Sequence, residues 1–252
     1  MSDERRQVLN IVTAISQALA PAMPALGFGI TVGARDGVSS PLEVPAGYAF
    51  SIWGLIFLLG LIYAVMQALP SARTSPLYRA IGTGTWMLFG LSTAWMLVAQ
   101  FEGPNIVLAT IIVIMLVISL RILVVAFKTG DETRNTVRQT VVLPLLGLYA
   151  GWLTLATALN VSGVLRDYAL APFGLQEWQY VALVLGAAAL VAVPMLLRLR
   201  GLIWYAAAAI WGLVGIILKA YPLAAPEAYV AYVAAAITTL LLLIVLRGFR
   251  RA

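Results

Sequence analysis

Long apolar segments separated by short polar breaks fill most of the chain. Eight segments of about 20 mostly apolar residues can be marked, which is the length that a helix needs to cross the hydrocarbon core of a bilayer. The segments span residues 8–30, 48–69, 81–100, 106–127, 140–160, 178–197, 202–218 and 228–246. The pattern therefore predicts an all-α fold, a bundle of eight membrane-spanning helices.

The breaks between the segments are rich in residues that favour turns. They lie at residues 33–45, 70–71, 102–104, 128–131, 162–172, 198–201 and 222–227. Only the break at 198–201 is short. A helix that continued through it would be far too long for a bilayer, so we predict a tight helical hairpin there.

The composition agrees with a protein that is dissolved mainly in lipid. Of its 252 residues, 62% are hydrophobic and 10% are charged, whereas soluble domains carry about 25% charged residues. The chain has no His and no Cys, which excludes disulfides, thiolate nucleophiles, His- or Cys-ligated metals and Ser-His-Asp triads. No Asp or Glu lies near the middle of a span, which argues against a proton pump. We expect no enzymatic activity and no resident cofactor.

The basic residues favour one side of the predicted topology. Thirteen Lys and Arg residues lie at the two termini and in alternate connections, and three lie on the opposite side: Arg35, Arg166 and Lys219. The positive-inside rule then places both termini in the cytoplasm and the chain in the cytoplasmic membrane. The net charge of +6 is an orientation signal, so we expect no nucleic-acid partner. Snorkelling or a headgroup contact explains Lys219, at the end of its span.

A few polar residues lie inside the spans. Asn10, Thr13 and Gln17 share one face of the first span because they are three and four positions apart. They either bond to neighbouring helices or line a cavity. The pattern Gly147-Leu-Tyr-Ala-Gly151 indicates close helix packing, within the chain or in a dimer.

Several of the seven tryptophans fall inside the spans, away from the interfaces where such rings usually lie. They are Trp53, Trp95, Trp152 and Trp211. A buried indole N–H needs a hydrogen-bond partner. Interior rings most often pack a core, and they also wall sites for flat hydrophobic ligands.

Three motifs around these tryptophans occur in order on the second, third and fifth spans. They are Pro45-Ala-Gly-Tyr48-Ala-Phe50-Ser-Ile-Trp53, Leu91-Ser92-Thr-Ala-Trp95 and Trp152-Leu-Thr-Leu-Ala156-Thr157-Ala-Leu159-Asn160. They resemble the patterns P-x-G-W-x-F-x-x-V-W, L-N-x-x-W and W-x-x-x-A-T-x-L-N of the TspO/MBR family, the translocator proteins or tryptophan-rich sensory proteins. The chain thus resembles that family.

The resemblance implies a five-helix unit, residues 1–161, to which residues 162–252 add a three-helix extension. It implies that the loop 31–45 is a lid over a ligand pocket that opens away from the termini. Members of that family bind tetrapyrroles, sterols and similar flat molecules, with roles in transport, sensing or breakdown. The candidate ligand-binding residues are Tyr48, Phe50, Trp53, Ser92, Trp95, Tyr149, Trp152, Ala156, Asn160 and Arg35.

In this interpretation the interior indoles stack on the ligand, while Asn160, Ser92 and Tyr149 orient it. Arg35 in the lid loop meets the carboxylates of a porphyrin. Without His or Cys, no axial ligand of those types is available to a metalloporphyrin, so the aromatic walls must supply the affinity.

A second hypothesis is of a different class. The added spans carry alanine-rich faces at 187–189, 206–209 and 234–236, and small residues suit close helix contacts. The protein could on this basis be a structural or assembly subunit of a larger membrane complex, such as a pigment–protein complex. A homodimer is a further alternative. Lipid and a small hydrophobic ligand are the expected partners otherwise.

Overall fold

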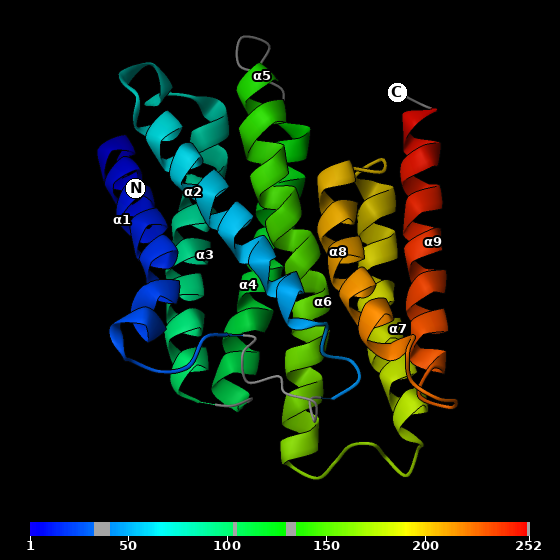
Figure 1. Ribbon diagram of the computed structural model, residues 1–252. Coiled ribbons are helices and arrows are strands. Elements are labelled where there is room, and N and C mark those ends of the chain that lie inside the picture. The colour runs from blue at the N-terminus through cyan, green and yellow to red at the C-terminus, as the bar shows by residue number, and fades with distance from the viewer. Residues whose placement is uncertain (33–40, 103–104, 130–134, 251–252) are drawn as a thin grey trace.

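The protein is an all-α, multi-pass membrane bundle. The computed structural model describes residues 1–32, 41–102, 105–129 and 135–250. Within these ranges eight helices are long and apolar enough to cross a membrane, and no strand occurs (Figure 1). The predicted fold class is confirmed.

The spans and the short helices beside them follow one another in a simple order. They are α1 (Asp3–Leu19) with the 3-10 helix η1 (Ala20–Leu26), η2 (Gly47–Ser51) with α2 (Ile52–Ala68), η3 (Pro70–Ala72), α3 (Pro76–Phe101), α4 (Ile106–Lys128), α5 (Asn135–Val137) with the π-helical η5 (Arg138–Val142) and α6 (Leu143–Asp167), then α7 (Glu177–Arg198), α8 (Ile203–Ala220) and α9 (Tyr229–Phe249).

Two helices are longer than their apolar segments predict. Helix α3 begins at Pro76 and not at residue 81, because proline is well suited to the first turn, where a backbone N–H has no helical partner. Helix α6 continues to Asp167, past Asn160 and past the expected unit boundary after residue 161. Its last turns are polar, and Ser162 and Arg166 find partners there.

The tight hairpin predicted at 198–201 is confirmed. Helix α7 ends at Arg198 and α8 begins at Ile203. The turn places Arg200 and Gly201 at φ values of 52° and 79°. A Cβ atom on Gly201 would lie 3.0 Å from the carbonyl oxygen of Ile244, so this position needs both the backbone freedom and the small size of glycine.

Helix α6 is the centre of the bundle. In its span, 94% of the most apolar window is buried inside the protein, against 22–50% for the other spans. It packs against α4, α8, α7 and α2. Helices α1–α3 lie on one side of it and α7–α9 on the other (Figure 1).

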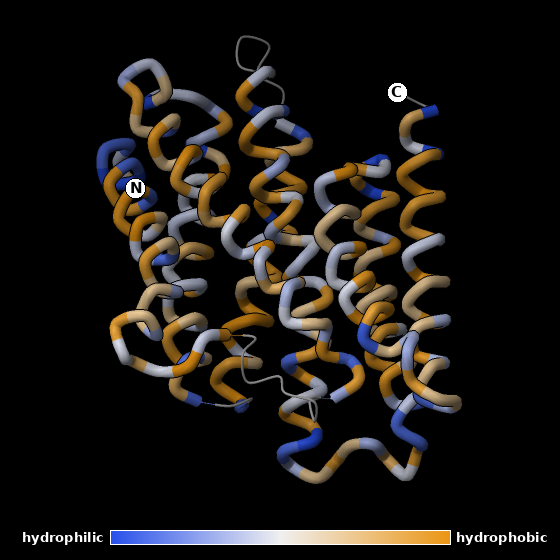
Figure 2. The backbone as a smooth tube through the Cα atoms, viewed as in Figure 1, coloured by the Kyte–Doolittle hydropathy of each residue, from blue (hydrophilic) through white to orange (hydrophobic). Residues whose placement is uncertain are grey.

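Both termini lie at the same end of the bundle, at the top of Figure 1. We call this the terminal end, and the opposite one the distal end. Apolar residues cover the lengths of the helices, and the most hydrophilic positions gather toward the two ends (Figure 2). The distribution of polar and apolar residues along the bundle thus matches a bilayer, which has an apolar core between two polar surfaces.

The polar face of α1 bonds to neighbouring helices. Asn10 donates to a backbone carbonyl of α3 (2.9 Å) and accepts from the hydroxyl of Thr85 (2.6 Å). Gln17 accepts from the hydroxyl of Tyr149 on α6 (2.9 Å). Thr13 donates to the backbone of its own helix. Asn10 and Gln17 therefore bond to neighbouring helices, which is one of the two interpretations of this face given above.

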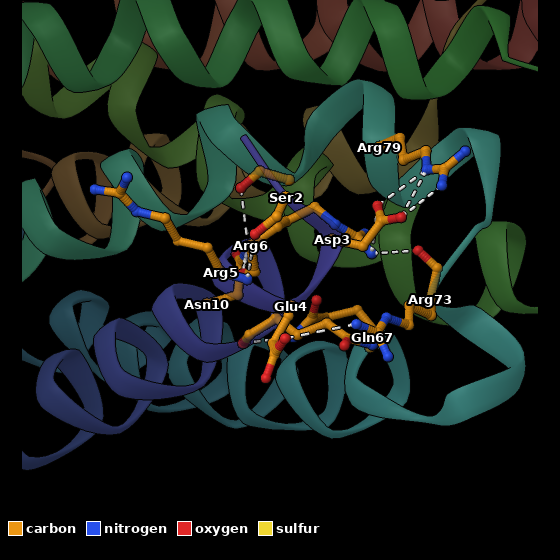
Figure 3. Close-up of polar contacts among 11 residues, drawn as sticks. Ser2, Asp3, Glu4, Arg5, Arg6, Asn10, Gln67, Arg73 and Arg79 are labelled. Carbon is orange, nitrogen blue, oxygen red and sulfur yellow. Dashed lines mark hydrogen bonds and ion pairs between the residues drawn. The ribbon is translucent and has the colours of Figure 1, made fainter.

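At the terminal end, charged side chains tie the start of α1 to the first turn of α3 and to the connection between α2 and α3 (Figure 3). Asp3 accepts from Arg79 Nε (2.9 Å). The buried Arg6 donates to the carbonyl oxygen of Arg73 (2.7 Å), whose guanidinium lies 3.6 Å from Glu4. These contacts hold α1 against the bundle.

Candidate functional site

A cavity of about 520 Å³ lies at the distal end, between the end of α1, the start of α2 and the end of α3. Phe50, Trp53 and Phe57 form an aromatic wall on the α2 side, and Met96 and Gln100 contribute from α3. Ligand sites in proteins usually have volumes of about 300–1,000 Å³ and mostly apolar walls. The cavity therefore has the size and surface of a site for a hydrophobic molecule.

The rim of this cavity is fixed by the end of α3. The amide of Gln100 donates to the carbonyl of Ala20 (2.8 Å), and the carbonyl of Gln100 accepts from Ile30 N–H (2.8 Å). Gly29, the residue before Ile30, has a φ of 76° and passes very close to α3. A Cβ atom on Gly29 would lie 2.8 Å from the Gln100 carbonyl oxygen. The chain after α1 is thus bonded to α3 as far as Ile30, and the next two residues, Thr31 and Val32, line the cavity.

The three motif tryptophans meet in one cluster directly behind the wall. Trp53 lies nearly parallel to Trp95, with ring centroids 6.1 Å apart, and edge-to-face with Trp152 at 6.3 Å. Phe50 packs edge-to-face on Trp152 at 5.8 Å. Of the cluster, Trp53 and Phe50 line the cavity, while Trp95 and Trp152 form a second layer that touches Trp53. The motifs therefore converge in space, and only the members from η2 and α2 face the hollow.

The indole N–H groups of Trp53, Trp95 and Trp152 are buried and have no hydrogen-bond partner among the described residues. A buried donor without a partner costs about 1–3 kcal/mol. Of these three indoles, Trp53 belongs to the cavity wall itself.

Tyr149 and Ser92 lie deeper in the bundle than the cavity. The Tyr149 hydroxyl donates to Gln17 on α1, and its ring stacks on Phe89 with centroids 6.2 Å apart. Ser92 is buried beside that hydroxyl. In the structure both residues join α6 to α1 and α3.

Three further candidates, Tyr48, Ala156 and Asn160, do not line the cavity. Asn160 donates to the carbonyl of Ala156 within α6 (2.9 Å), and neither residue lines the hollow. Tyr48 is exposed and packs edge-to-face on Trp211 of α8, with centroids 5.4 Å apart. Arg35 lies outside the described residues.

Helix α8 forms hydrogen bonds with the segment 41–49, which leads into α2. Lys219 Nζ donates to the carbonyls of Pro41 (2.9 Å) and Val44 (3.1 Å), and the Trp211 indole donates to the carbonyl of Ala49 (2.9 Å). Between them, the carbonyl of Gly215 accepts from Ala46 N–H at 3.2 Å. The ammonium of Lys219 thus has protein carbonyls as partners at the end of its span, which the interpretation as a snorkelling or headgroup residue did not include.

The same segment is held on its other side by a partly buried ion cluster. Arg166 on α6 makes two-pronged contacts with Glu43 (2.9 and 3.0 Å) and with Glu177 at the start of α7 (2.7 and 3.0 Å). Its guanidinium carbon lies 4.6 Å from the ring centre of Tyr180. Ser162 donates to Glu43 as well. In the described ranges, no group of three or more acidic residues that could hold a metal ion occurs.

A family model described as TSPO-like protein matches residues 7–247. The chain belongs to the TSPO-like family. The resemblance to the TspO/MBR family is thereby confirmed, and the match in this TSPO-like protein runs through α7, α8 and α9. No curated protein and no solved structure matches the chain.

The residues that frame the site of this TSPO-like protein from α8 are missing from the sequence-based candidates. Trp211, Gly215 and Lys219 are four positions apart, so they share one helix face. This spacing was readable from the sequence. Their partners were not, since the partners are backbone groups of a segment that lies far away along the chain.

Proposed function

We propose that this TSPO-like protein binds a flat hydrophobic ligand, of tetrapyrrole or sterol type, in the distal cavity and serves its transport or sensing. The observation that carries the proposal is the aromatic wall of the cavity. Trp53 lines it with a buried indole N–H that has no partner among the described residues. A flat ring system gains stacking from such a wall, and an acceptor on it satisfies the donor.

The second aromatic layer supports this role by fixing the wall in advance. Trp95 and Trp152 contact Trp53 from two directions, so its ring is held in one orientation before a ligand arrives. A wall that is already ordered loses little conformational freedom on binding. The aromatic wall of Phe50, Trp53 and Phe57 supplies the affinity for a tetrapyrrole, in place of axial ligation by His or Cys. Arg35 in the lid loop pairs with its carboxylates.

The proposal includes an orientation. The bias of basic residues toward the terminal end puts that end in the cytoplasm and the chain in the cytoplasmic membrane. The cavity then opens on the side away from the cytoplasm, and the ligand enters from there or from the adjacent leaflet.

A titration with protoporphyrin IX, followed by tryptophan fluorescence, tests the proposal. Gly54 lines the cavity, and a Cβ there would meet no atom within 4 Å, so Gly54→Leu puts a side chain into empty space. We expect quenching with the wild type and affinity about tenfold weaker or worse for the variant, a change of 1.4 kcal/mol or more.

Gly186→Leu on α7 is the matched control, because a Cβ there also meets no atom within 4 Å and the residue lies outside the cavity. It should bind like the wild type. Equal affinity of Gly54→Leu and the wild type would show that the ligand does not occupy this cavity.

The assembly hypothesis has less support, because the alanine-rich faces are used largely within the chain. Ala188, Ala208 and Ala234 are buried in the contacts among α6, α7, α8 and α9. Native mass spectrometry of gently extracted protein separates the hypotheses. A monomer or dimer that carries a small molecule supports ligand binding, and stable co-purification with other subunits supports assembly.

A further inference from the structure

A second apolar hollow, separate from the distal cavity, runs along α6 between α4 and α7. Its volume is about 340 Å³. On α6 it extends from Thr154 to Leu165, which is about 16 Å at a rise of 1.5 Å per residue. Leu116 of α4 and Leu183 of α7 border it, and Leu183 is 59% exposed. The hollow is thus a groove that opens sideways toward the hydrocarbon of the bilayer.

The walls of the groove suit a hydrocarbon chain. The few polar side chains along its length already have partners: Thr154 donates to the carbonyl of Ala150 (2.8 Å) and pairs with the Tyr205 hydroxyl (2.8 Å). Thr157 bonds to the carbonyl of Ile112. A polar molecule would find no groups to bind there, whereas an acyl chain needs only contact.

The distal mouth of the groove is polar and carries negative charge. Ser162 and Tyr180 line it and bond to each other (2.9 Å). Immediately beyond them lies the cluster of Glu43, Glu177 and Arg166, in which two carboxylates share one guanidinium. The cluster has a formal charge of −1, and Glu177 is its most exposed carboxylate, at 36%.

The whole distal end reinforces this charge. Its described acidic residues are Glu43, Glu102, Asp167, Glu177 and Glu227, against the basic residues Arg166 and Lys219. Arg166 is engaged by its two carboxylates, and Lys219 donates to two carbonyls. An anionic head group is repelled at this surface, and an ammonium group is attracted.

We propose that the groove is a lipid site. A bilayer lipid with an ammonium-bearing head group lays one acyl chain along α6 between α4 and α7 and places its ammonium against Glu177. The apolar walls select the chain, and the net charge of the mouth selects the head group. This site is independent of the distal cavity and of the ligand proposed for it.

The test uses the full-length protein in vesicles of equal parts phosphatidylethanolamine and phosphatidylglycerol, extracted mildly and analysed by native mass spectrometry. We expect phosphatidylethanolamine to be retained about fivefold over phosphatidylglycerol, the preference that one charge near a membrane surface gives. Ala187→Phe, at an exposed position on the groove wall, should abolish the retention. Leu190→Phe on the same helix, at a side chain 78% exposed outside the groove, should keep it.

A second pair of variants tests the head group. Glu177→Gln should reduce the preference to near equality, while Glu227→Gln, at the same end but away from the groove, should leave it unchanged. Circular dichroism confirms that each variant is folded, and Val161→Phe on the α6 wall replaces Ala187→Phe if that variant is not.

Equal retention of the two lipids by the wild type, or a preference for phosphatidylglycerol, would overturn the proposal. So would a second copy of the chain seated on the groove, seen as a dimer that Ala187→Phe dissociates without loss of bound lipid. Protoporphyrin binding that is lost in Gly54→Leu but kept in Ala187→Phe would separate the two sites, whichever way the lipid result falls.

Discussion

At the residue scale, one guanidinium organises the distal end. Arg166 holds Glu43, which precedes α2, and Glu177, which begins α7, so it joins three parts of the chain. Glu43 is buried, and its two oxygens accept from Arg166 and Ser162. Glu43→Gln removes the charge and one acceptor oxygen. We expect the free energy of unfolding to fall by about 2 kcal/mol, measured by denaturant titration in detergent.

Glu102→Gln is the matched control for that change. The Glu102 carboxylate is exposed and accepts a hydrogen bond from the Asn105 side chain (2.9 Å), and exposed polar contacts contribute about 0–1 kcal/mol. If Glu43→Gln were as stable as Glu102→Gln, the ion cluster would not be what holds the segment before α2.

A second residue acts on the same segment from α8. Lys219→Met keeps the apolar stem and removes the ammonium that binds the carbonyls of Pro41 and Val44. Two lost bonds of about 1 kcal/mol each should speed amide exchange of residues 41–49 by about tenfold or more, measured by hydrogen–deuterium exchange. Lys128→Met at the terminal end should leave this segment unchanged. An unchanged exchange rate in Lys219→Met would mean that the bonds from Lys219 do not limit local opening of residues 41–49.

At the element scale, α6 and α8 pack through glycines. A Cβ on Gly151 would lie 2.1 Å from the Tyr205 carbonyl oxygen, and one on Gly147 would lie 2.7 Å from the Trp204 side chain. The G-x-x-x-G pattern therefore serves contact within the chain. Gly151→Ala forces the helices apart, at a cost of about 1–3 kcal/mol.

That change should lower the thermal unfolding temperature and leave the oligomeric state as it was, which size-exclusion chromatography with light scattering would report. Gly186→Ala, where a Cβ meets open space in the interior of α7, should leave the oligomeric state unchanged and should not lower the unfolding temperature, because alanine favours the helix more than glycine does. A variant at Gly151 that alters the dimer content and not the stability would restore the interpretation as a dimer contact.

The sequence was sufficient to predict the membrane spans, but it was not sufficient to predict which residues surround the cavity. Apolar length identifies each span, and turn residues identify the hairpin at 198–201. The motifs also predicted that Trp53, Trp95 and Trp152 come together. Local spacing does not encode which ring faces a hollow, and the contributions of Gln100 and the α8 face depend on packing between distant helices.

At the scale of the whole molecule, the eight spans make a testable statement about topology. Eight crossings put both termini at one end, and from the concentration of basic residues there we predict that this end faces the cytoplasm. The chain has no cysteine, so a single introduced thiol reports its own position without background. Thr74 is exposed in the connection between α2 and α3 at the terminal end, and Ala224 is exposed between α8 and α9 at the distal end.

In intact cells we expect a membrane-impermeant maleimide to label Ala224→Cys and to reach Thr74→Cys only after permeabilisation. The opposite pattern would invert the orientation and put the mouth of the cavity in the cytoplasm, so that the ligand would have to come from inside the cell. Labelling of both thiols in intact cells would contradict the count itself, because two positions on the same side must be separated by an even number of crossings, whereas five spans lie between Thr74 and Ala224. The experiment thus decides which side of the membrane supplies the ligand before its identity is known.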